Sequence, residues 1–280
     1  MRDLLLFTHI PKTAGITFLH VVSAQYRMRQ IHNARGASPD TVKLIATLRK
    51  KKAIRFVRGH FGFGVHELID RSSRYLCFLR EPIARVISHY YFHCHVHDAV
   101  PDWVAFCASH ENTMTRYLSG AKFTAAYSGA PPEPTDQATL EAAKSNLQQH
   151  YWFGITERFD ESILLFRNRL AWDIPCYKSR NITPKKPVSP EPQDILSLIE
   201  RHNRFDIELY AFANELFDQT LATQPWNLEQ ELNEFRTRND TPAARNAAAV
   251  QSLRLFMPKF KFRARVELQK LRNLIRQGRT

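Results

Sequence analysis

The chain has only four cysteines and no long apolar run near its start. Cys77, Cys94, Cys107 and Cys176 are scattered without paired C-x-x-C spacing, and an even count in a chain of this size is weak evidence for disulfides. The apolar residues 4–7 are followed at once by Thr and His, so neither a spanning helix nor the core of a signal peptide is expected. We therefore expect reduced thiols and a cytoplasmic location.

Acidic residues are also scarce, and their shortage is uneven along the chain. The 280 residues hold 40 Lys and Arg against 27 Asp and Glu, a net charge of +13, within a globular composition that is 44% hydrophobic and 24% charged. Residues 241–280 contain ten basic residues and one acid, Glu267, so +9 lies there and +4 in the rest. A binder of nucleic acid or another anionic polymer is one alternative class. No recognised nucleic-acid motif is present, so nucleic acid is not expected as a partner.

Short apolar runs alternate with segments of helical periodicity. The runs predict strands at residues 4–10, 53–57, 75–79 and 151–156. The periodic segments predict helices from residue 15 onward, after Pro82, and over 102–121, 161–171 and 193–219. Strands that alternate with helices imply a mainly parallel sheet. We therefore expect an α/β fold with a mainly parallel sheet flanked by helices.

Polar residues gather directly after three predicted strands, which is the edge where open α/β sheets bind ligands. Residues 11–17, Pro-Lys-Thr-Ala-Gly-Ile-Thr, combine small residues, a lysine and two hydroxyls at the start of a helix, as a phosphate cradle requires. They do not form the nucleotide triphosphatase loop G-x-x-x-x-G-K-S/T, because the lysine precedes the glycine, and no obvious acidic magnesium ligand ends a strand. An ordinary turn with a solvated lysine is the alternative.

Residues 80–88, Arg-Glu-Pro-Ile-Ala-Arg-Val-Ile-Ser, indicate a second anion site. An arginine ends the strand and a hydroxyl lies eight residues further on the helix, and a guanidinium fork with a hydroxyl can hold a phosphate. Arginine at a strand end is common, so this motif is weak by itself. Two anion sites on neighbouring loops are more specific, because they match a ligand with phosphates at two separate positions.

Residues 9–15 and 78–91 closely resemble the carbohydrate sulfotransferases of the heparan-sulfate and dermatan-sulfate uronyl 2-O type and their bacterial relatives, sulfotransferase family 2. Further segments that agree with this resemblance are 58–60, 112–118, 153–159 and 180–186. The resemblance covers roughly residues 4–220, judged by where such segments stop. It implies a P-loop-like parallel sheet and a sulfotransferase domain over 1–220.

The resemblance also implies a donor co-substrate, 3′-phosphoadenosine 5′-phosphosulfate (PAPS), and no metal. The residues expected to hold the 5′-phosphosulfate are Lys12, Thr13, Ala14, Gly15 and Ile16, with Thr17 nearby. Arg80 and Ser88 are expected to hold the 3′-phosphate. The segment that closes over the nucleotide in the family supplies weaker candidates: Arg180, Thr183 and Lys185.

Sulfuryl transfer resembles phosphoryl transfer in depending on in-line positioning and charge stabilisation, and Lys12 suits the leaving phosphate. An imidazole at a strand end suits the base for the acceptor hydroxyl, which favours His60. The animal 2-O enzymes show His-Gly-His where this chain has Arg58-Gly59-His60, so the base assignment stays open. The expected acceptor is a saccharide. The rival enzyme class is a nucleotide-dependent phosphotransferase, disfavoured by the missing triphosphatase loop.

Several histidines, His89, His93, His95 and His97, lie near Cys94 and raise the question of a metal. His89 and His93 are one helical turn apart, but the residues between them do not complete the H-E-x-x-H pattern. We therefore expect no metal and interpret these side chains as solvated or as facing the acceptor.

Residues 221–280 are predicted to form a helical, basic C-terminal extension. Within it, Ala264, Leu268, Leu271 and Ile275 form an apolar stripe among arginines and lysines, the pattern of a basic amphipathic helix. One interpretation is a helix packed on the core with a solvated basic face. The others are contact with an anionic membrane surface, peripheral at the inner face of the membrane, or contact with an anionic polymer.

Overall fold

The computed structural model of the chain describes residues 3–34, 41–97, 100–121, 134–173, 177 and 191–241. Its strands form a five-stranded sheet in the order β2-β3-β1-β4-β5, and every neighbouring pair is parallel. The strands are β1 Leu4–Thr8, β2 Ile31–Asn33, β3 Phe56–Gly59, β4 Ser73–Leu79 and β5 Tyr151–Ile155. The α/β class and the parallel sheet that the sequence predicts are confirmed.

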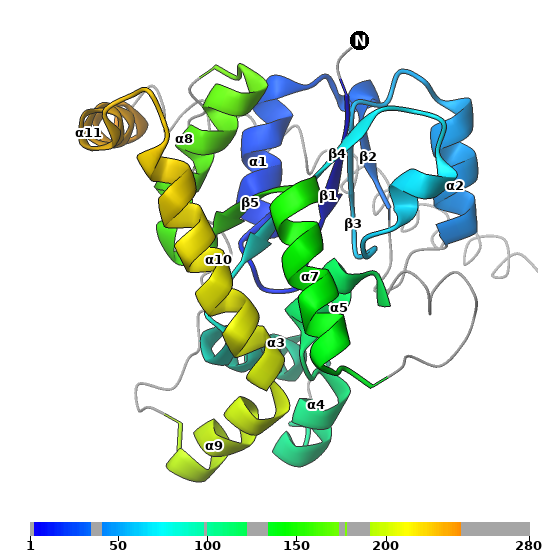
Figure 1. Cartoon of the computed structure of the whole chain (residues 1–280), viewed down its shortest axis with the longest axis vertical. Coiled ribbons are helices and arrows are strands. Elements are labelled where there is room, and N and C mark those ends of the chain that lie inside the picture. Colours follow the sequence, from blue (N-terminus) through cyan, green and yellow to red (C-terminus); the bar gives the residue numbers. More distant parts are fainter. Residues whose placement is uncertain are drawn as a thin grey trace, which may run out of the picture.

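Helices cover both faces of this sheet (Figure 1). Their bounds are α1 Gly15–Gln25, α2 Thr41–Lys50, α3 Pro82–His97, α4 Trp103–Ser109, α5 Thr113–Ser119, α7 Gln137–His150, α8 Phe159–Leu170, α9 Gln193–His202, α10 Arg204–Ala222 and α11 Leu228–Asn239. Side chains alternate between the faces along each strand, so Leu4 and Leu6 join one apolar cluster and Leu5 and Phe7 the other. Both faces of the central strands are therefore buried, as parallel sheets require.

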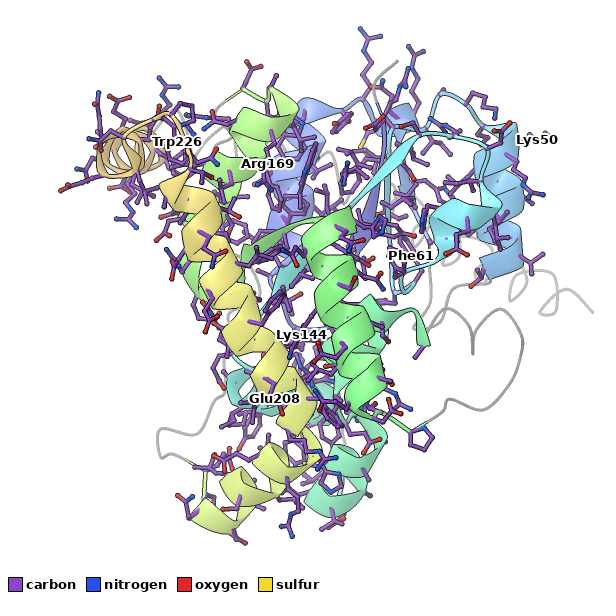
Figure 2. The ribbon with its side chains drawn as sticks, in the orientation of Figure 1. Lys50, Phe61, Lys144, Arg169, Glu208 and Trp226 are labelled. Atoms are coloured by element: carbon purple, nitrogen blue, oxygen red, sulfur yellow. The ribbon has the colours of Figure 1, made fainter. Side chains whose placement is uncertain are left out.

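The two clusters are built from different helices. The first holds side chains of α2, α5, α7 and α10, together with Phe61, which follows β3 and is labelled in Figure 2. The second holds side chains of α1, α8 and α11 around Phe18, whose ring lies 5.2 Å from Phe78 and 5.3 Å from Phe166. A third cluster joins α3, α4 and α9 beyond the carboxyl ends of the strands, at the lower end of the molecule in Figure 1.

Two of the helices predicted from periodicity are each two helices in the structure. The predicted helix 102–121 is interrupted between α4 and α5, where Asn112 adopts a left-handed conformation with φ of 40°. The predicted helix 193–219 is interrupted at Asn203, between α9 and α10. In both cases an asparagine supplies the break, which the apolar periodicity passes over.

The order of the strands places a topological switch point beside β1. The chain proceeds from β1 to β2 and β3 on one side of it, and then to β4 and β5 on the other. The loops that follow β1 and β4 consequently leave neighbouring strands on opposite faces, and the crevice between such loops is where open α/β sheets bind ligands.

The segment predicted as a C-terminal extension begins, in its described part, as a helix packed on the core. Phe235 of α11 is buried with α1 and α8, and Arg167 of α8 forms an ion pair with Glu231 at 2.8 Å. The apolar stripe of the predicted basic helix, residues 264–275, lies outside the described residues. The division of the chain at residue 220 stays a prediction.

Candidate functional site

The loop between β1 and α1 is held in an unusual backbone conformation. Lys12 and Ala14 have positive φ values of 69° and 58°, although neither is a glycine. A left-handed residue with a side chain costs roughly 1–2 kcal/mol, so the surrounding contacts must hold the loop in this form. Left-handed residues that interrupt right-handed ones turn successive backbone N–H groups toward one point, which forms a concave site for an anion.

Position 15, the first residue of α1, has to be a glycine because the imidazole of His9 lies directly against it. A Cβ atom added to Gly15 would lie 2.0 Å from the imidazole Cδ2 of His9, far inside contact distance. The imidazole of His9 therefore packs directly on the backbone at the start of the helix, and only glycine leaves room for it. The N-terminus of α1 also contributes the positive end of its dipole to the same place.

The two threonines of the loop are both buried. Thr13 is 0% exposed, and its hydroxyl donates to the carbonyl of Ile10 at 2.9 Å. Its side chain therefore stabilises the turn, and its backbone N–H is the group left for an anion. Thr17 is 4% exposed and lies one turn into the helix, while Ala14 and Ile16 are partly exposed.

Arg80 joins the second motif to the first. It follows β4, and its guanidinium Nη1 donates to the carbonyl of Lys12 at 3.0 Å. The Nε atom lies 3.8 Å from the carboxylate of Glu157, which follows β5. The two anion-binding motifs that the sequence separates by almost seventy residues are thus in contact at the switch point.

The carboxylates at this edge are occupied by contacts within the protein. Glu81 accepts hydrogen bonds from the backbone N–H groups of Ile83 and Ala84 and so caps the start of α3. Glu157 accepts from the N–H of Glu81 and from the hydroxyl of Tyr210. Both acids follow strands, and the contacts that they make are those of helix capping and loop positioning.

Ser88 lies two turns into α3 and is 4% exposed. Among the described residues, none receives a hydrogen bond from its side-chain hydroxyl. The hydroxyl oxygen itself is not among the fully buried polar atoms without a partner, so it is open to solvent and can bond to a ligand.

His60, His9 and Arg58 form a chain of contacts at the ends of β1 and β3. Nδ1 of His60 donates to the backbone carbonyl of His9 at 2.6 Å, and the two rings lie 4.6 Å apart. This bond fixes the proton of a neutral His60 on Nδ1 and leaves Nε2 as the basic nitrogen. Arg58 donates from Nη2 to Nδ1 of His9 at 2.8 Å.

Burial and the neighbouring positive charge of Arg58 keep His9 neutral. Burial lowers the pKa of His9 well below its usual value, and the positive charge of Arg58 lowers it further. Burial also lowers the pKa of Arg58 to about 10, which leaves the guanidinium charged at neutral pH. His9 thus serves as a hydrogen-bond acceptor for Arg58, and the missing histidine of the His-Gly-His pattern is replaced by an arginine that orients another histidine.

The structure brings most of the predicted site residues together and adds others. The loop from Lys12 to Thr17, Arg80 and His60 meet at one edge, while the ammonium of Lys12 lies 4.5 Å over the ring of Phe92 on α3. Arg180, Thr183 and Lys185 lie outside the described residues. The sequence interpretation missed His9 as a positioning residue; the signal available was its place directly after the strand.

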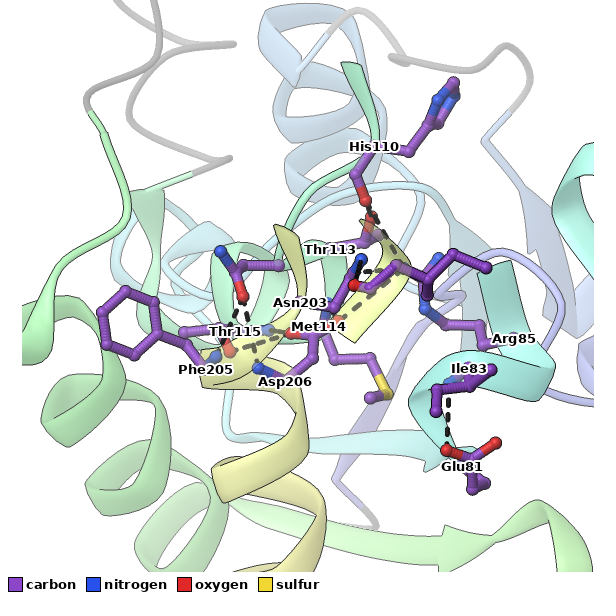
Figure 3. A network of polar contacts seen from close by, with 12 residues as sticks. Glu81, Ile83, Arg85, His110, Thr113, Met114, Thr115, Asn203, Phe205 and Asp206 are labelled. Carbon is purple, nitrogen blue, oxygen red and sulfur yellow. Dashed lines mark hydrogen bonds and ion pairs between the residues drawn. The ribbon is translucent and has the colours of Figure 1, made fainter. Parts of the chain in front are cut away.

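A buried polar network holds α3 in place behind the site (Figure 3). Arg85 and Asp206 are both 0% exposed and lie 3.7 Å apart, and Arg85 also donates to the Asn203 side chain at 3.2 Å. Asp206 accepts from the backbone N–H groups of Met114 and Thr115, so it caps α5 from α10. The network therefore connects the helix that carries Ser88 to two other helices.

The chain is similar in sequence to curated sulfotransferases. It is 26% identical to heparan-sulfate 6-O-sulfotransferase 2 of Homo sapiens over 274 positions, which cover 78% of this chain and 45% of the human protein. The same enzyme of Mus musculus is 26% identical with 44% of its length covered, and that of Gallus gallus is 26% identical over 277 positions with 67% covered. The chain thus spans about half the length of the human and mouse relatives.

Among solved structures, the mouse sulfotransferase SULT7A1 complexed with PAP aligns with 89% of this chain and 90% of its own. The TM-score is 0.40 at 12% sequence identity. No protein-family model matches the chain. Within the described ranges, no helix combines the length and the apolar character needed to cross a membrane.

Proposed function

We propose that this chain is a sulfotransferase that moves a sulfuryl group from PAPS to a hydroxyl of a carbohydrate. One observation carries the proposal: Arg80 donates to the carbonyl of Lys12, so two anion-binding motifs meet at the switch point of a parallel sheet. PAPS bears anionic groups at its 5′ and 3′ positions and needs two such motifs side by side. The sequence similarity to heparan-sulfate 6-O-sulfotransferase 2 over 78% of the chain supports the reaction and the class of acceptor.

In this proposal, the backbone N–H groups from Thr13 to Ile16 hold the 5′-phosphosulfate. Arg80 and the hydroxyl of Ser88 hold the 3′-phosphate, the first as a charged fork and the second as a neutral donor. Lys12 supplies a positive charge for the leaving phosphate, which becomes more negative as the sulfuryl group departs. Arg180, Thr183 and Lys185 stay candidates for the nucleotide contact on the strength of the sequence resemblance.

His60 is the proposed base. The acceptor oxygen forms a bond to sulfur while the bond between sulfur and the phosphate oxygen breaks, and the hydroxyl proton passes to Nε2 of His60. The bond from Nδ1 to the carbonyl of His9 supports this role, because it orients the ring and stabilises the imidazolium that forms. Arg58 acts through His9 as a positioning residue and does not contact the acceptor in this proposal.

The position that is sulfated is a finer proposal. The motifs at residues 9–15 and 78–91 resemble the uronyl 2-O type, whereas the curated relatives described above are 6-O enzymes. Both types act on glycans, so we assign a glycan as acceptor and take the 2-O position as the assignment to be tested. Analysis of a sulfated disaccharide product distinguishes the two positions directly.

The first experiment tests the nucleotide site. Thermal unfolding of the purified chain is followed with adenosine 3′,5′-bisphosphate and, separately, with ATP and magnesium. A ligand that binds only the folded state raises the midpoint according to its concentration over Kd. Stabilisation by the bisphosphate and not by ATP supports the proposal, and the reverse result supports a phosphotransferase.

The second experiment tests the reaction. Labelled PAPS is incubated with the chain and with polysaccharides, glycolipids and small alcohols as acceptors. Transfer to a saccharide supports the proposal. Transfer to small alcohols alone would support the sulfotransferase activity but contradict the assignment of a carbohydrate as the acceptor. The cytoplasmic location inferred from the sequence stays a prediction.

A further inference from the structure

Three histidines converge beside the middle of α3, and none of them is among the residues proposed to contact PAPS. His89 and His93 lie one turn apart on α3, and His110 ends α4. One ring nitrogen of each lies within 4.8 Å of a ring nitrogen of the other two. The sequence shows the pair on the helix, but it does not show that a residue seventeen positions further along the chain completes a set of three.

The three rings are arranged around a common point. Their centroids lie 4.9 Å apart for His89 and His93, 4.6 Å for His89 and His110, and 5.3 Å for His93 and His110. Each pair is close to perpendicular, with interplanar angles of 77°, 84° and 71°. A tetrahedral Zn²⁺ bound to imidazole nitrogens at about 2.0–2.1 Å places the ring centroids about 5 Å apart, which is the spacing seen here.

The hydrogen bonding of His110 leaves a nitrogen for a metal. Its Nδ1 lies 2.9 Å from the hydroxyl oxygen of Ser109 and 2.9 Å from the carbonyl of Phe106; because the carbonyl can only accept, Nδ1 donates to it and a neutral ring carries its lone pair on Nε2. The ring of Phe106 stacks on it at 4.3 Å with an angle of 25°. A backbone carbonyl on one nitrogen and a metal on the other is the usual environment of a metal-binding histidine. Figure 3 shows the imidazole of His110 pointing away from the polar network, in which its own carbonyl takes part.

His89 provides the buried side of the site. It is 8% exposed, and within the described part of the chain its Nδ1 is buried with no hydrogen-bond partner. A buried nitrogen left unsatisfied costs free energy that a metal ion would remove. His93 and His110 are partly exposed and provide access from solvent.

The positive charges near the three histidines oppose a cation, so only a metal ion that imidazole binds strongly is expected at this place. Arg85 and Lys12 are close enough to lower the pKa of His89, and their positive charge opposes a cation. The ion pair with Asp206 offsets the charge of Arg85. None of the carboxylates in the described ranges joins the three histidines, which disfavours Ca²⁺ and Mg²⁺ because these ions take oxygen ligands. Imidazole suits Zn²⁺ and its neighbours among the transition metals.

We propose that His89, His93 and His110 form a binding site for Zn²⁺, with three imidazole ligands and a fourth position open to water. The ion links α3 to the end of α4. Because Ser88 directly precedes His89, a bound ion also restrains the turn of α3 that carries the proposed 3′-phosphate contact. This inference does not depend on the sulfotransferase proposal, since the three ligands and their geometry stand without a nucleotide.

Metal binding by the full chain, free of any tag and stripped with a chelator, tests the proposal. Zn²⁺ is titrated against a chromophoric chelator, and Co²⁺ is added separately because a tetrahedral Co²⁺ site absorbs visible light strongly. We expect one Zn²⁺ per chain, with the affinity falling at least tenfold in His93→Ala and in His110→Ala. His95→Ala is the matched control, because His95 is an exposed histidine of the same helix. It should bind Zn²⁺ as the unchanged chain does.

The proposal is overturned if the unchanged chain binds Zn²⁺ no more tightly than His93→Ala, or if His95→Ala loses as much affinity as the other variants. Circular dichroism establishes that each variant is folded. Should both alanine variants unfold, the Co²⁺ spectrum of the unchanged chain decides, since the absence of tetrahedral absorption rejects the site. No nucleotide is present in these measurements, so their outcome is separate from that of the bisphosphate experiment.

Discussion

Individual side chains at the switch point divide into those that can touch a ligand and those that shape the backbone. The hydroxyl of Thr13 donates a hydrogen bond to the carbonyl of Ile10, and Gly15, which has no side chain, leaves space for the ring of His9. Arg80 does both, since it donates one N–H to Lys12 and presents the rest of a half-buried fork to the same edge. The strained conformations of Lys12 and Ala14 are stabilised by these neighbours, which is the usual arrangement at a preorganised site.

Arg80→Ala should weaken binding of adenosine 3′,5′-bisphosphate more than Ser88→Ala does. A charge-assisted fork exceeds a neutral hydroxyl donor by ~1 kcal/mol or more, which is a difference of several-fold to tenfold in Kd. Isothermal calorimetry measures both. Arg80→Lys, which keeps the charge and loses the fork, should lie between the two, and exposed Arg201→Ala is the control. Unchanged affinity in Arg80→Ala would remove its assignment to the 3′-phosphate.

Lys12 and His60 should affect turnover more than binding. Lys12→Ala is expected to lower kcat far more than the affinity for the product nucleotide, because its charge matters most as the leaving phosphate gains negative charge.

His60→Ala should lower kcat by roughly 10²- to 10⁴-fold with nucleotide affinity intact. Steady-state kinetics with labelled PAPS, beside calorimetry, separates the two effects. A fully active His60→Ala means that another residue is the base.

His9 should make the folded state sensitive to acid. Its pKa is lowered well below 6.5 in the fold, so between pH 6.5 and that lower value the unfolded chain binds more protons than the folded chain. Its contribution to stability is therefore complete above pH 6.5 and is lost as the pH falls, by at most ~1.4 kcal/mol per pH unit.

The variant His9→Asn tests this, because its amide oxygen can still accept from Arg58 but does not titrate. Urea unfolding at about pH 7.5 and about pH 5.5 gives the free energies. The unchanged chain should lose roughly 1 kcal/mol more than His9→Asn over this interval. Equal losses in the two proteins would show that His9 has the same proton affinity in the folded and unfolded chains.

Among the helices, α3 is held in place by the ion pair between Arg85 and Asp206, which is fully buried and inaccessible to a ligand. Asp206→Ala leaves the fully buried Arg85 without its counter-charge and removes the cap of α5, so we expect a loss of ~3–5 kcal/mol in the free energy of unfolding. Asp218→Ala, on the same helix, removes an exposed ion pair with Arg158 and should cost about 1 kcal/mol or less. Denaturant unfolding measures the free energy of unfolding of both variants. Similar losses in the two would show that the buried network contributes no more to stability than an exposed ion pair.

The regular elements that face the core could be predicted from the sequence, and those fixed by distant contacts could not. The apolar runs locate β1, β4 and β5 to within two residues, because both faces of each strand are buried. The three-residue β2 and the polar α7 escaped prediction, since neither has a long apolar pattern. The break at Asn112 is stabilised by its contact with Asp206, and the break at Asn203 by its contact with Arg85, so both depend on residues that lie far along the chain.

The same distinction holds for the site. The resemblance and the strand ends predict the loop at Lys12, Arg80 and His60, and the structure places all three at one edge. The contact of Arg58 with His9 and the convergence of His110 on α3 join residues from separate elements. Periodicity and motif spacing report only neighbours in sequence, so such pairs appear first in the structure.

The charge of the whole chain is concentrated where no resemblance extends. Residues 241–280 carry +9 of the net +13, while the part that forms the sheet and its helices is nearly balanced. A basic segment in the same chain as the proposed glycan site would raise the local concentration of an anionic acceptor, and an anionic lipid surface would attract the same segment. Both effects weaken as salt screens the charges over about 8–10 Å.

Deletion of residues 258–280 should therefore leave the affinity for adenosine 3′,5′-bisphosphate unchanged and raise KM for a polymeric or membrane-borne acceptor. The difference from the full chain should shrink at high salt, because counterions then compete for the basic residues. Pelleting with anionic vesicles separates the two sources: retention on vesicles by the full chain alone supports the membrane, and unchanged pelleting with a KM effect on soluble glycan supports the polymer. Melting of the truncated chain at a much lower temperature would show instead that the apolar stripe, at Ala264, Leu268, Leu271 and Ile275, packs on the core.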